Sequence, residues 1–505
     1  MSAVEWAYQL VARSSTNGFA WRFASVALLG GALLAAQLRR WWWLRRNRFP
    51  RVPGWPWFGV VADLIDPEKL CPTLEAWSRS YGAGGIFEFD LVGERILAVC
   101  DYEHLKPLLS MRPFRMTRSS KLVSTGIADL VPGLFMVEGR RWGVQRRLTA
   151  PAFSARAVQS YLPDICGTVG LLVGELERAA PGGALVNVSS MMRRTTGAIL
   201  VKLAFGEEVD SLRQLSTESQ ALSVLLAGVQ TRMTSPLPYW RIPGLSGPID
   251  GMNGALRTLR QRAFAILQNP KGAAQAQFLS SMLSAESDSK LSQEEVVGNL
   301  IVLLVAGTDT TSTTLSWALY HLARHPDVQD EVAAEVACLA GGLPLAESVG
   351  SLLWAQAVWR ESLRLNSVAP TLFLEVAEPC EIDGHAVPQG TTIWAMMQES
   401  CRRSSELRDV IGDDWDAWRP RRWIVEGGAG LRSCPPFDDS MAFGHGARLC
   451  PGKLMSNTVG PLVLAEILRR FAIGEWRGAP MHRKMEFTVC PARDIELRFS
   501  ARAAA

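Results

Sequence analysis

The segment Phe443-Gly444-His445-Gly446-Ala447-Arg448-Leu449-Cys450-Pro451-Gly452 decides the fold of this 505-residue chain. Gly446 and Gly452 allow backbone angles that other residues avoid, so that peptide N–H groups can turn inward and hydrogen-bond to the sulfur of Cys450. The segment fits the pattern F-x-x-G-x-R-x-C-x-G, which arises by chance on the order of once in a few thousand such chains. A buried free cysteine is the alternative, because a lone cysteine usually packs as a small apolar residue. The matching positions favour a thiolate held ready to bind a metal; they are Phe443, Gly446, Arg448, Cys450 and Gly452.

This pattern resembles the cysteine loop of the cytochrome P-450 family of haem-thiolate monooxygenases. The resemblance implies haem b, iron protoporphyrin IX, as the cofactor and Cys450 as the axial ligand of its iron. It also implies that Arg448 binds a haem propionate and that Phe443 shields the thiolate from water. Gly446 and Gly452 would complete the cofactor-binding loop. Three further segments of the chain agree with this family.

A long buried helix is predicted from about Gln293 to Ala323. Ser292 and Glu295 form a capping box at its start, and Pro326 stops it beyond its end. About thirty residues at 1.5 Å each give roughly 45 Å, which is enough to cross a domain. Residues 300–306 are apolar on all sides, so the helix is expected to be buried.

A polar segment, Ala306-Gly307-Thr308-Asp309-Thr310-Thr311, stands inside this helix. The Thr310 hydroxyl can donate to the Ala306 carbonyl four residues earlier and open a groove where dioxygen or water fits. The resemblance places this groove over the haem and gives Asp309 and Thr310 the catalytic role of relaying protons. Threonine packing beside a solvated aspartate is the alternative. Val302, Ala306 and Val368 are expected to line the substrate pocket.

A second helix is predicted from Trp354 to Leu365 and carries Glu361 and Arg364 at i,i+3 spacing. Such a pair on a helix surface contributes only a few tenths of a kcal/mol. The resemblance implies that Arg422 joins them in a buried structural triad before the cysteine loop. The family usually has Pro-Glu-Arg-Phe around this arginine, and Arg421 and Trp423 depart from that motif.

Trp142 and Arg146 stand at i,i+4 spacing in Gly139-Arg140-Arg141-Trp142-Gly143-Val144-Gln145-Arg146-Arg147. Their indole and guanidinium groups share one helix face, which resembles the W-x-x-x-R helix that binds haem propionates in the family. A basic helix face with a packed tryptophan is the alternative. Leu374 stands where the family often has a further propionate-binding arginine. That anchor is therefore expected to be missing, or to be supplied by Arg402 or Arg403.

Charge and cysteine content exclude other classes of protein. The nine cysteines include no C-x-x-C pair, so neither a zinc site nor a disulfide framework is indicated. The formal net charge is only +4, and the six arginines between residues 39 and 51 exceed it on their own. The basicity is therefore local, and it implies no nucleic-acid partner.

An apolar run from Phe23 to Leu38, followed by the arginines and by three tryptophans, predicts a single N-terminal transmembrane helix. The positive charges place the rest of the chain on the cytosolic side. A cleaved signal peptide or a core helix is the alternative. The segment from Phe49 to Pro56 resembles the proline-rich hinge of membrane-anchored members of the family, which indicates the endoplasmic reticulum. A loop over residues 235–244, with Tyr239 and Trp240, is expected to be a lid that touches the membrane.

These features predict a mainly α fold with a minor β component, the cytochrome P-450 fold, preceded by one transmembrane helix. Residues 1–48 would be the membrane anchor with its basic flank, 49–60 the hinge and 61–505 the haem-thiolate domain. Short strands are expected within Glu381 to Pro388 and Phe487 to Cys490.

The resemblance implies a monooxygenase that inserts one oxygen atom of dioxygen into a lipophilic small molecule, by hydroxylation or epoxidation. Electrons would come from NADPH through a flavin (FAD/FMN) reductase, with cytochrome b5 as a further partner and membrane lipid as the surroundings. A haem-thiolate isomerase or dehydratase of a lipid hydroperoxide is one alternative, although it would not need Asp309 and Thr310. A non-catalytic haem sensor or carrier is the other.

Overall fold

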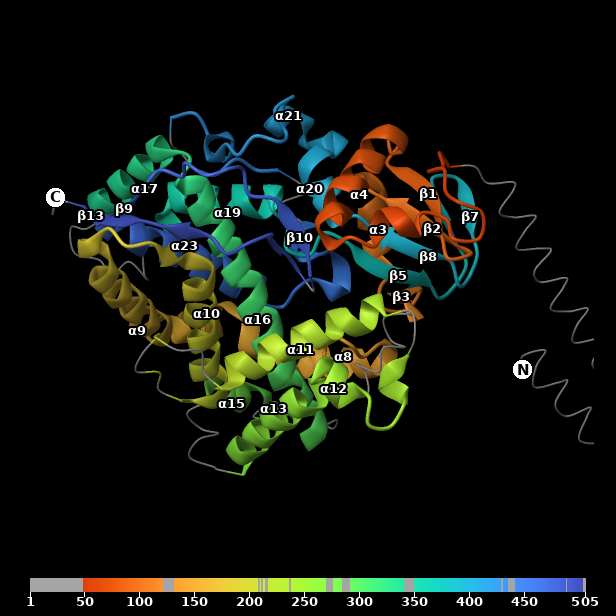
Figure 1. The fold of residues 1–505 in the computed structure, drawn as a ribbon, viewed down its shortest axis with the longest axis horizontal. Coiled ribbons are helices and arrows are strands. Elements are labelled where there is room, and N and C mark those ends of the chain that lie inside the picture. The colour runs from red at the N-terminus through yellow and green to blue at the C-terminus, as the bar shows by residue number, and fades with distance from the viewer. Residues whose placement is uncertain are drawn as a thin grey trace, which may run out of the picture.

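The computed structural model describes residues 49–120, 131–207, 209, 212–213, 217–235, 238–268, 276–283, 291–339, 349–427, 430–434, 441–486 and 488–502. The expected membrane anchor of residues 1–48 lies outside the described residues. Helices fill one side of the molecule, and a five-stranded sheet with short helices around it forms the other (Figure 1). The expectation of a mainly helical fold with a minor β component is therefore confirmed.

Sixteen α-helices are found in the described residues. They are α3 (Val61–Leu64), α4 (Pro67–Tyr81), α5 (Tyr102–Ser110), α8 (Gly139–Thr149), α9 (Ala155–Ala179), α10 (Val188–Phe205), α11 (Thr217–Thr234), α12 (Ser246–Asp250), α13 (Met252–Leu267), α15 (Gln277–Leu283), α16 (Gln293–Leu322), α17 (Pro326–Leu339), α19 (Leu353–Leu365), α20 (Met397–Arg403), α21 (Arg408–Ile411) and α23 (Lys453–Arg470). Several short 3₁₀ turns connect them, among them η7 (Met441–Phe443) and η8 (Gly446–Arg448).

The strands are short. They are β1 (Ile86–Leu91), β2 (Glu94–Val99), β3 (Met116–Arg118), β4 (Val186–Asn187), β5 (Leu372–Val376), β6 (Cys380–Ile382), β7 (His385–Val387), β8 (Thr392–Ala395), β9 (Phe471–Ile473), β10 (Arg483–Met485), β11 (Val489–Pro491), β12 (Glu496–Leu497) and β13 (Phe499–Ala501). Strands β6, β7 and β11 occupy the two segments where strands were predicted, so that prediction is confirmed.

The central helix α16 spans the 30 residues from Gln293 to Leu322, in agreement with the predicted helix. Ser292 and Glu295 form the expected capping box at its start. Helix α10 packs along it, and α19 and α23 also contact it. Among the described residues α16 alone has the length and hydropathy of a membrane span, but most of its apolar stretch is buried in the core.

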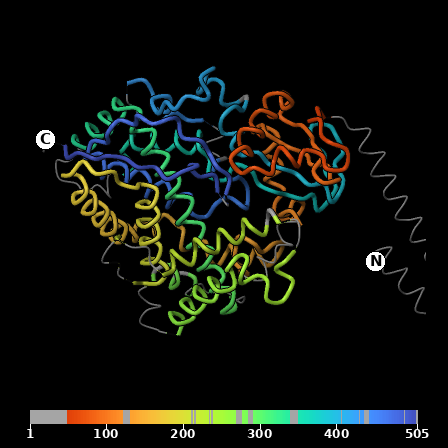
Figure 2. Tube along the Cα trace, viewed as in Figure 1, coloured from red at the N-terminus to blue at the C-terminus, as the bar shows by residue number. Residues whose placement is uncertain are grey.

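The five-stranded sheet has the order β1-β2-β8-β5-β3. Strands β1 and β2 form a hairpin, β8 joins β2 in parallel, and β5 and β3 continue antiparallel. Figure 2 shows that early and late parts of the chain, coloured red to orange and cyan, meet in this sheet. Arg118 of β3 pairs directly with Leu374 of β5 in this register.

The expected hinge of residues 49–60 is attached to the same sheet. The Val52 peptide N–H donates to the Glu88 carbonyl at 2.9 Å, and the Val60 N–H donates to the Asp90 carbonyl, also at 2.9 Å. The side chains of Val52 and Val60 are buried. Val52 and Val60 therefore attach this segment to the sheet.

The predicted lid around Tyr239 is fixed by a buried polar cluster. The Tyr239 hydroxyl donates to Asp250 at 2.9 Å, and Arg232 of α11 donates to the same carboxylate at 2.9 Å. Tyr239 is buried and Trp240 is half-buried. The expectation that these two rings face a membrane is therefore wrong, because Asp250 and Arg232 draw the polar tip of Tyr239 inward.

Candidate functional site

The cysteine loop, residues 441–452, runs through η7 and η8 into the start of α23. The Cys450 N–H donates to the Phe443 carbonyl at 2.9 Å and closes the loop. Gly446 has a φ of +69°, which favours glycine, and a Cβ added there would lie 3.0 Å from the Leu109 carbonyl oxygen. Glycine at this position therefore allows the loop to pack against the end of α5.

Peptide N–H groups and a guanidinium lie next to the Cys450 sulfur and act against the effect of burial on its pKa. Burial raises the pKa of the Cys450 thiol, while the Gly452 N–H, the Arg146 guanidinium and the Lys453 N–H act in the opposite direction. Cys401 on α20 is a useful contrast, because burial raises its thiol pKa to about 12 and no peptide N–H lowers it. Cys450 is also exposed at its surface, whereas Cys401 is buried. A thiolate with N–H donors and an open face is suited to ligating a metal.

Trp142 and Arg146 lie on α8, as predicted, beside the cysteine loop. Trp142 is buried, and the guanidinium of Arg448 stacks over its ring at 4.6 Å from the centroid. Burial lowers the pKa of Arg146, and the neighbouring Cys450 raises it. The structure thus brings together four predicted cofactor-binding residues from two segments of the chain: Trp142, Arg146, Arg448 and Cys450.

Glu138 directly precedes α8 and lies near three arginines. We call these four residues the Glu138 cluster: Glu138, Arg112, Arg118 and Arg448. Its carboxylate lies 2.5 Å from Arg448 Nη2, 3.6 Å from Arg118 Nε and 3.8 Å from Arg112 Nη2. Arg448 Nη1 also donates to the Leu134 carbonyl at 3.0 Å. Only the first of these three ion pairs is as short as a hydrogen bond.

Four buried nitrogens of the Glu138 cluster have no hydrogen-bond partner among the described residues. They are Nε and Nη2 of Arg112, Nε of Arg118 and Nε of Arg448. Burial lowers the pKa of Arg112 to about 10 and that of Arg118 to about 9. The unused N–H groups of these buried arginines fit the carboxylates of a ligand. The Cys450 sulfur with its N–H donors fits an iron. Together they fit a flat apolar ligand that carries an iron and two carboxylates. Haem has these features, and the residues present fit it.

One face of α16 carries the predicted catalytic segment. The Thr310 hydroxyl donates to the Ala306 carbonyl at 2.6 Å, as the sequence predicted. Ala306 is exposed and Val302 is half-buried, although the flanking turns of the helix are buried. These two residues and Thr310 stand at helical spacing and share this open face. Val368 lies apart on a loop, where it is buried and its carbonyl accepts a bond from the Val489 N–H at 2.9 Å.

Asp309 does not bond to Thr310. Its Oδ2 accepts a hydrogen bond from the Thr488 hydroxyl at 2.5 Å, and Thr488 directly precedes β11. Burial raises the pKa of Asp309, while Thr488 and the charge of Arg193 lower it. The sequence offered no signal for Thr488, because this contact joins residues 179 positions apart.

Glu361, Arg364 and Arg422 come together as the sequence predicted, and Trp423 joins them in what we call the Glu361 network. Arg364 binds the Glu361 carboxylate with two bonds of 2.8 Å, and Arg422 Nε adds a third of 3.1 Å. Trp423 Nε1 donates to Glu361 Oε2 at 2.8 Å, and the Arg419 N–H donates to Oε1 at 2.9 Å. The tryptophan that departs from the family motif therefore supplies a hydrogen bond that phenylalanine cannot make.

Arg402 and Arg403, the expected substitutes for the missing haem anchor, are engaged elsewhere. Arg402 Nη1 donates to Glu75 at 2.8 Å, and Arg403 Nε donates to Glu399 at 3.2 Å. Both arginines also lie near the ring of Trp415. Carboxylates on α4 and α20 thus hold both side chains, and the source of the anchor stays a prediction.

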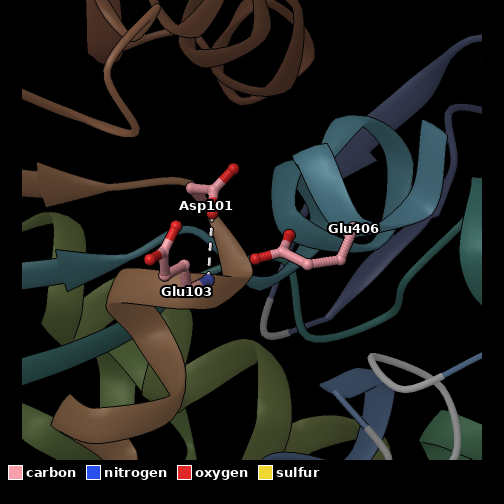
Figure 3. A group of neighbouring side chains, drawn as sticks. All are labelled: Asp101, Glu103 and Glu406. Atoms are coloured by element: carbon pink, nitrogen blue, oxygen red, sulfur yellow. Dashed lines mark hydrogen bonds between the residues drawn. The ribbon is translucent and has the colours of Figure 1, made fainter.

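A separate group of carboxylates lies at the start of α5 (Figure 3). Asp101, Glu103 and Glu406 each offer an oxygen within 4.8 Å of the others. Asp101 caps α5 by accepting from the Glu103 N–H at 2.9 Å, and Glu406 accepts from Ser404 at 2.5 Å. Asp101 therefore serves as a helix cap, and Glu406 closes a loop. We do not take this group of carboxylates as the functional site.

Comparison with known proteins agrees with this geometry. The sequence model of a family described as cytochrome P-450 matches residues 50–499. The human mitochondrial 25-hydroxyvitamin D-1 alpha hydroxylase is 29% identical over 396 residues, which cover 73% of this chain and 75% of the relative. The Arabidopsis thaliana cytokinin hydroxylase is 27% identical over 445 residues, with 85% and 83% covered. A crystal structure of a cytochrome P-450 haem domain superimposes with a TM-score of 0.77 at 24% identity and covers 90% of this chain and 98% of its own.

Proposed function

We propose that this chain, which belongs to the cytochrome P-450 family, is a monooxygenase that inserts one oxygen atom of dioxygen into a lipophilic small molecule. Electrons would come from NADPH through a flavin reductase. The observation that carries the proposal is the setting of the Cys450 sulfur, which has the Gly452 and Lys453 N–H groups and Arg146 beside it. Bound haem b would supply oxygen activation, with the thiolate as the iron ligand that pushes electron density toward it.

The residues of the chain supply binding and proton handling around that group. Trp142, Arg146 and Arg448 would hold the haem carboxylates, and Phe443 and Gly446 would shape the loop around the sulfur. On α16, the bond from Thr310 to Ala306 leaves the Thr310 hydroxyl oxygen able to accept a hydrogen bond from water or substrate. Val302 and Ala306 would form the apolar wall for the substrate, with Val368 beside them.

Asp309 would act as the proton source behind Thr310. Because burial raises its pKa, the carboxyl takes up and releases a proton nearer to neutral pH than an exposed aspartate does. The Thr488 hydroxyl holds this carboxyl through its Oδ2 atom. Thr488 is therefore a positioning residue in this proposal.

The docking surface for the electron donor would lie on α8. Arg140 and Arg147 are exposed there, close in sequence to Arg146, which faces the cysteine loop. A flavin reductase with an acidic surface, or cytochrome b5, would be steered to this basic face.

Residues 1–48 would anchor the enzyme by one helix in the endoplasmic reticulum, with the catalytic domain of residues 61–505 in the cytosol. Exposed rings within residues 49–60 support membrane contact: Trp55 is 76%, Trp57 87% and Phe58 64% exposed. Tryptophan and phenylalanine on a turn are suited to the interfacial region of a bilayer.

The decisive experiment compares ferrous–CO spectra of the wild type and of Cys450→Ala. We expect the red-shifted Soret band of thiolate-ligated haem only in the wild type, because Cys450 is the cysteine that stands in the F-x-x-G-x-R-x-C-x-G pattern. Cys401→Ala is the matched control and should keep the band. A thiolate-type band in Cys450→Ala would refute the assignment.

Turnover tests the role of α16. In Thr310→Ala the haem spectrum should stay normal, while the product formed per NADPH consumed should fall by about tenfold and hydrogen peroxide should rise. Thr314→Ala, which removes a hydroxyl that bonds back to the Thr310 carbonyl on the same helix, is the control. An unchanged ratio in Thr310→Ala would exclude the proton-relay role, and turnover without NADPH would favour an isomerase.

A further inference from the structure

A surface pocket lies between the start of α4 and the start of β10, which pack against each other (Figure 1). Its volume of about 390 Å³ falls in the range of small-molecule pockets, roughly 300–1,000 Å³. Lys69 and Arg483 contribute positive charge to its walls, and Asp66 and Glu68 contribute negative charge. None of these four residues belongs to the site around the cysteine loop. The pocket therefore offers both signs of charge to a ligand of its own.

The guanidinium of Arg483 is held in place but is not fully used. Its Nη2 donates to Glu75 on α4 at 2.6 Å, while its Nη1 is buried and has no hydrogen-bond partner among the described residues. Glu75 also accepts from Arg79 and, at 2.8 Å, from Arg402. Although burial raises the pKa of Glu75, Arg402 and then Arg483 bring it down to about 2. One carboxylate is thus shared by three guanidinium groups, so Arg483 has positive charge left for a further anion.

The negative charge in the pocket comes from two carboxylates at the start of α4. Asp66 accepts from the Glu68 N–H at 3.0 Å and lies 3.5 Å from Lys69 Nζ. The side chains of Lys69 and Asp66 are 77% and 40% exposed, so this ion pair is weak and can open for a ligand. Two carboxylates suit an ammonium group, which has three N–H donors. A ligand with an anion and an ammonium a few bonds apart therefore matches the walls.

The residues that precede the pocket indicate where such a ligand comes from. Ile65 is 76% exposed, and Trp55, Trp57 and Phe58 earlier in the same segment are exposed as well. Exposed apolar and aromatic side chains of this kind suit the interfacial region of a bilayer. The pocket wall begins one residue later, at Asp66. Contact of Ile65 with a bilayer therefore brings the pocket to the level of the phospholipid headgroups.

We propose that this pocket binds the headgroup of an ethanolamine phospholipid. The phosphate accepts hydrogen bonds from Arg483 and Lys69, and the ammonium donates to Asp66 and Glu68. Ethanolamine fits better than choline, because only a primary ammonium can donate hydrogen bonds to carboxylates. The headgroup site does not depend on bound haem, and it gives the globular part of the chain a specific lipid contact in addition to residues 1–48.

Isothermal titration calorimetry of the full-length, haem-containing protein in a non-ionic detergent tests the chemistry of the site. The probe is glycerophosphoethanolamine, the headgroup without its acyl chains. Lys69→Ala and Arg483→Leu should each weaken its binding about 5- to 50-fold, because each removes a charge-assisted hydrogen bond. Glu68→Gln should weaken it by a similar factor but leave the binding of inorganic phosphate unchanged. Arg469→Leu removes a surface arginine on α23 and is the control that should bind like the wild type.

Nanodiscs of phosphatidylcholine with a minor share of phosphatidylethanolamine test the source of the headgroup. When the discs are dissolved in detergent, one phosphatidylethanolamine should stay with each wild-type protein and none with Arg483→Leu, as counted by native mass spectrometry. Tighter binding of free phosphoethanolamine than of glycerophosphoethanolamine, with no lipid retained, would overturn the lipid as the ligand.

Equal affinity of the wild type and Lys69→Ala for glycerophosphoethanolamine would overturn the site. Inorganic phosphate that binds as tightly as glycerophosphoethanolamine would also overturn it, since the carboxylates would then take no part. Because the Lys69 side chain is largely exposed, Lys69→Ala decides the question even if Arg483→Leu does not fold. The ferrous–CO spectrum should be the same in the wild type and all folded variants, so failure of the headgroup site is distinguishable from failure of the proposed function.

Discussion

The Glu361 network and the Glu138 cluster are both buried groups of arginines around one glutamate, but only the first is complete. Glu361 is fully buried and accepts five hydrogen bonds. Arg364 and Arg422 also donate to backbone carbonyls, among them those of Trp415 and Ala417. In the Glu138 cluster four arginine nitrogens have no partner among the described residues.

This difference separates a structural group from a binding group. A satisfied buried network holds its elements in one arrangement, and here it fixes α19 to the segment before the cysteine loop. An unsatisfied cluster is unfavourable until a ligand completes it. The Glu361 network should therefore contribute the same free energy of unfolding with and without the cofactor. The contribution of the Glu138 cluster should change when the cofactor binds.

The largest effect is expected from breaking the complete network. Glu361→Gln leaves Arg364 buried without its anion and leaves Arg422 with Asp414 alone, so we expect the free energy of unfolding to fall by about 3–5 kcal/mol, with or without haem. Urea unfolding followed by circular dichroism measures this change. Glu331→Gln is the control, because Glu331 is 48% exposed. A loss of less than about 1 kcal/mol would show that the network is not structural.

A smaller effect, which depends on the cofactor, is expected in the incomplete cluster. Glu138→Gln removes the anion that the three arginines share, so the haem-free protein should lose about 1–3 kcal/mol of unfolding free energy. The haem-bound protein should lose much less, because the haem carboxylates then face the same arginines. Thermal unfolding of both forms gives the comparison. Equal losses in the two forms would mean that both networks are structural and would remove the contrast between them.

Local sequence patterns predicted the parts of this site that lie within one helix or one loop. The capping box, the bond from Thr310 to Ala306 and the shared helix of Trp142 and Arg146 each follow from spacing within a few residues. The pairing of Arg118 with Leu374 and the contact of Thr488 with Asp309 join residues far apart in the chain. Such contacts depend on strand register and tertiary packing, for which a single sequence carries no local signal.

Trp423 shows the same limit within a motif. The sequence marks it as a departure from phenylalanine, yet its indole N–H is one of the five donors to Glu361. Trp423→Phe should therefore cost about 1–2 kcal/mol, less than Glu361→Gln because four donors remain. Unfolding in urea checks this value. Trp415→Phe is the matched control, since the Trp415 ring contacts arginines but its indole is not a donor to Glu361. No loss in Trp423→Phe would show that the remaining donors fully compensate.

The smallest change in the free energy of unfolding is expected at a third carboxylate, Asp309 on α16. Glu361 has two arginine partners, and although burial raises its pKa, Arg364 and then Arg422 bring it below the ordinary value. At Asp309 burial is the largest effect on the pKa and Glu486 adds to it, so the pKa stays raised although the Thr488 hydroxyl and Arg193 lower it. Burial raises the pKa of Asp309 above its ordinary value of 3.8 only in the folded state. Ionising this carboxyl therefore costs more in the folded protein than in the unfolded chain. The free energy of unfolding should fall as the pH rises from 3.8 through the raised pKa.

Asp309→Asn keeps a group that accepts from Thr488 but cannot ionise. We therefore expect the variant to be slightly more stable than the wild type at pH 8, and the difference to shrink steadily as the pH falls toward 4. Urea unfolding at several pH values measures this difference, and Asp330→Asn, a surface change at a residue 72% exposed, should show no such trend. The same variant should turn over poorly, since it has no proton to give. A difference that is independent of pH would mean that Asp309 is already paired as well as Glu361 is, and that its carboxyl is not held ready for proton transfer.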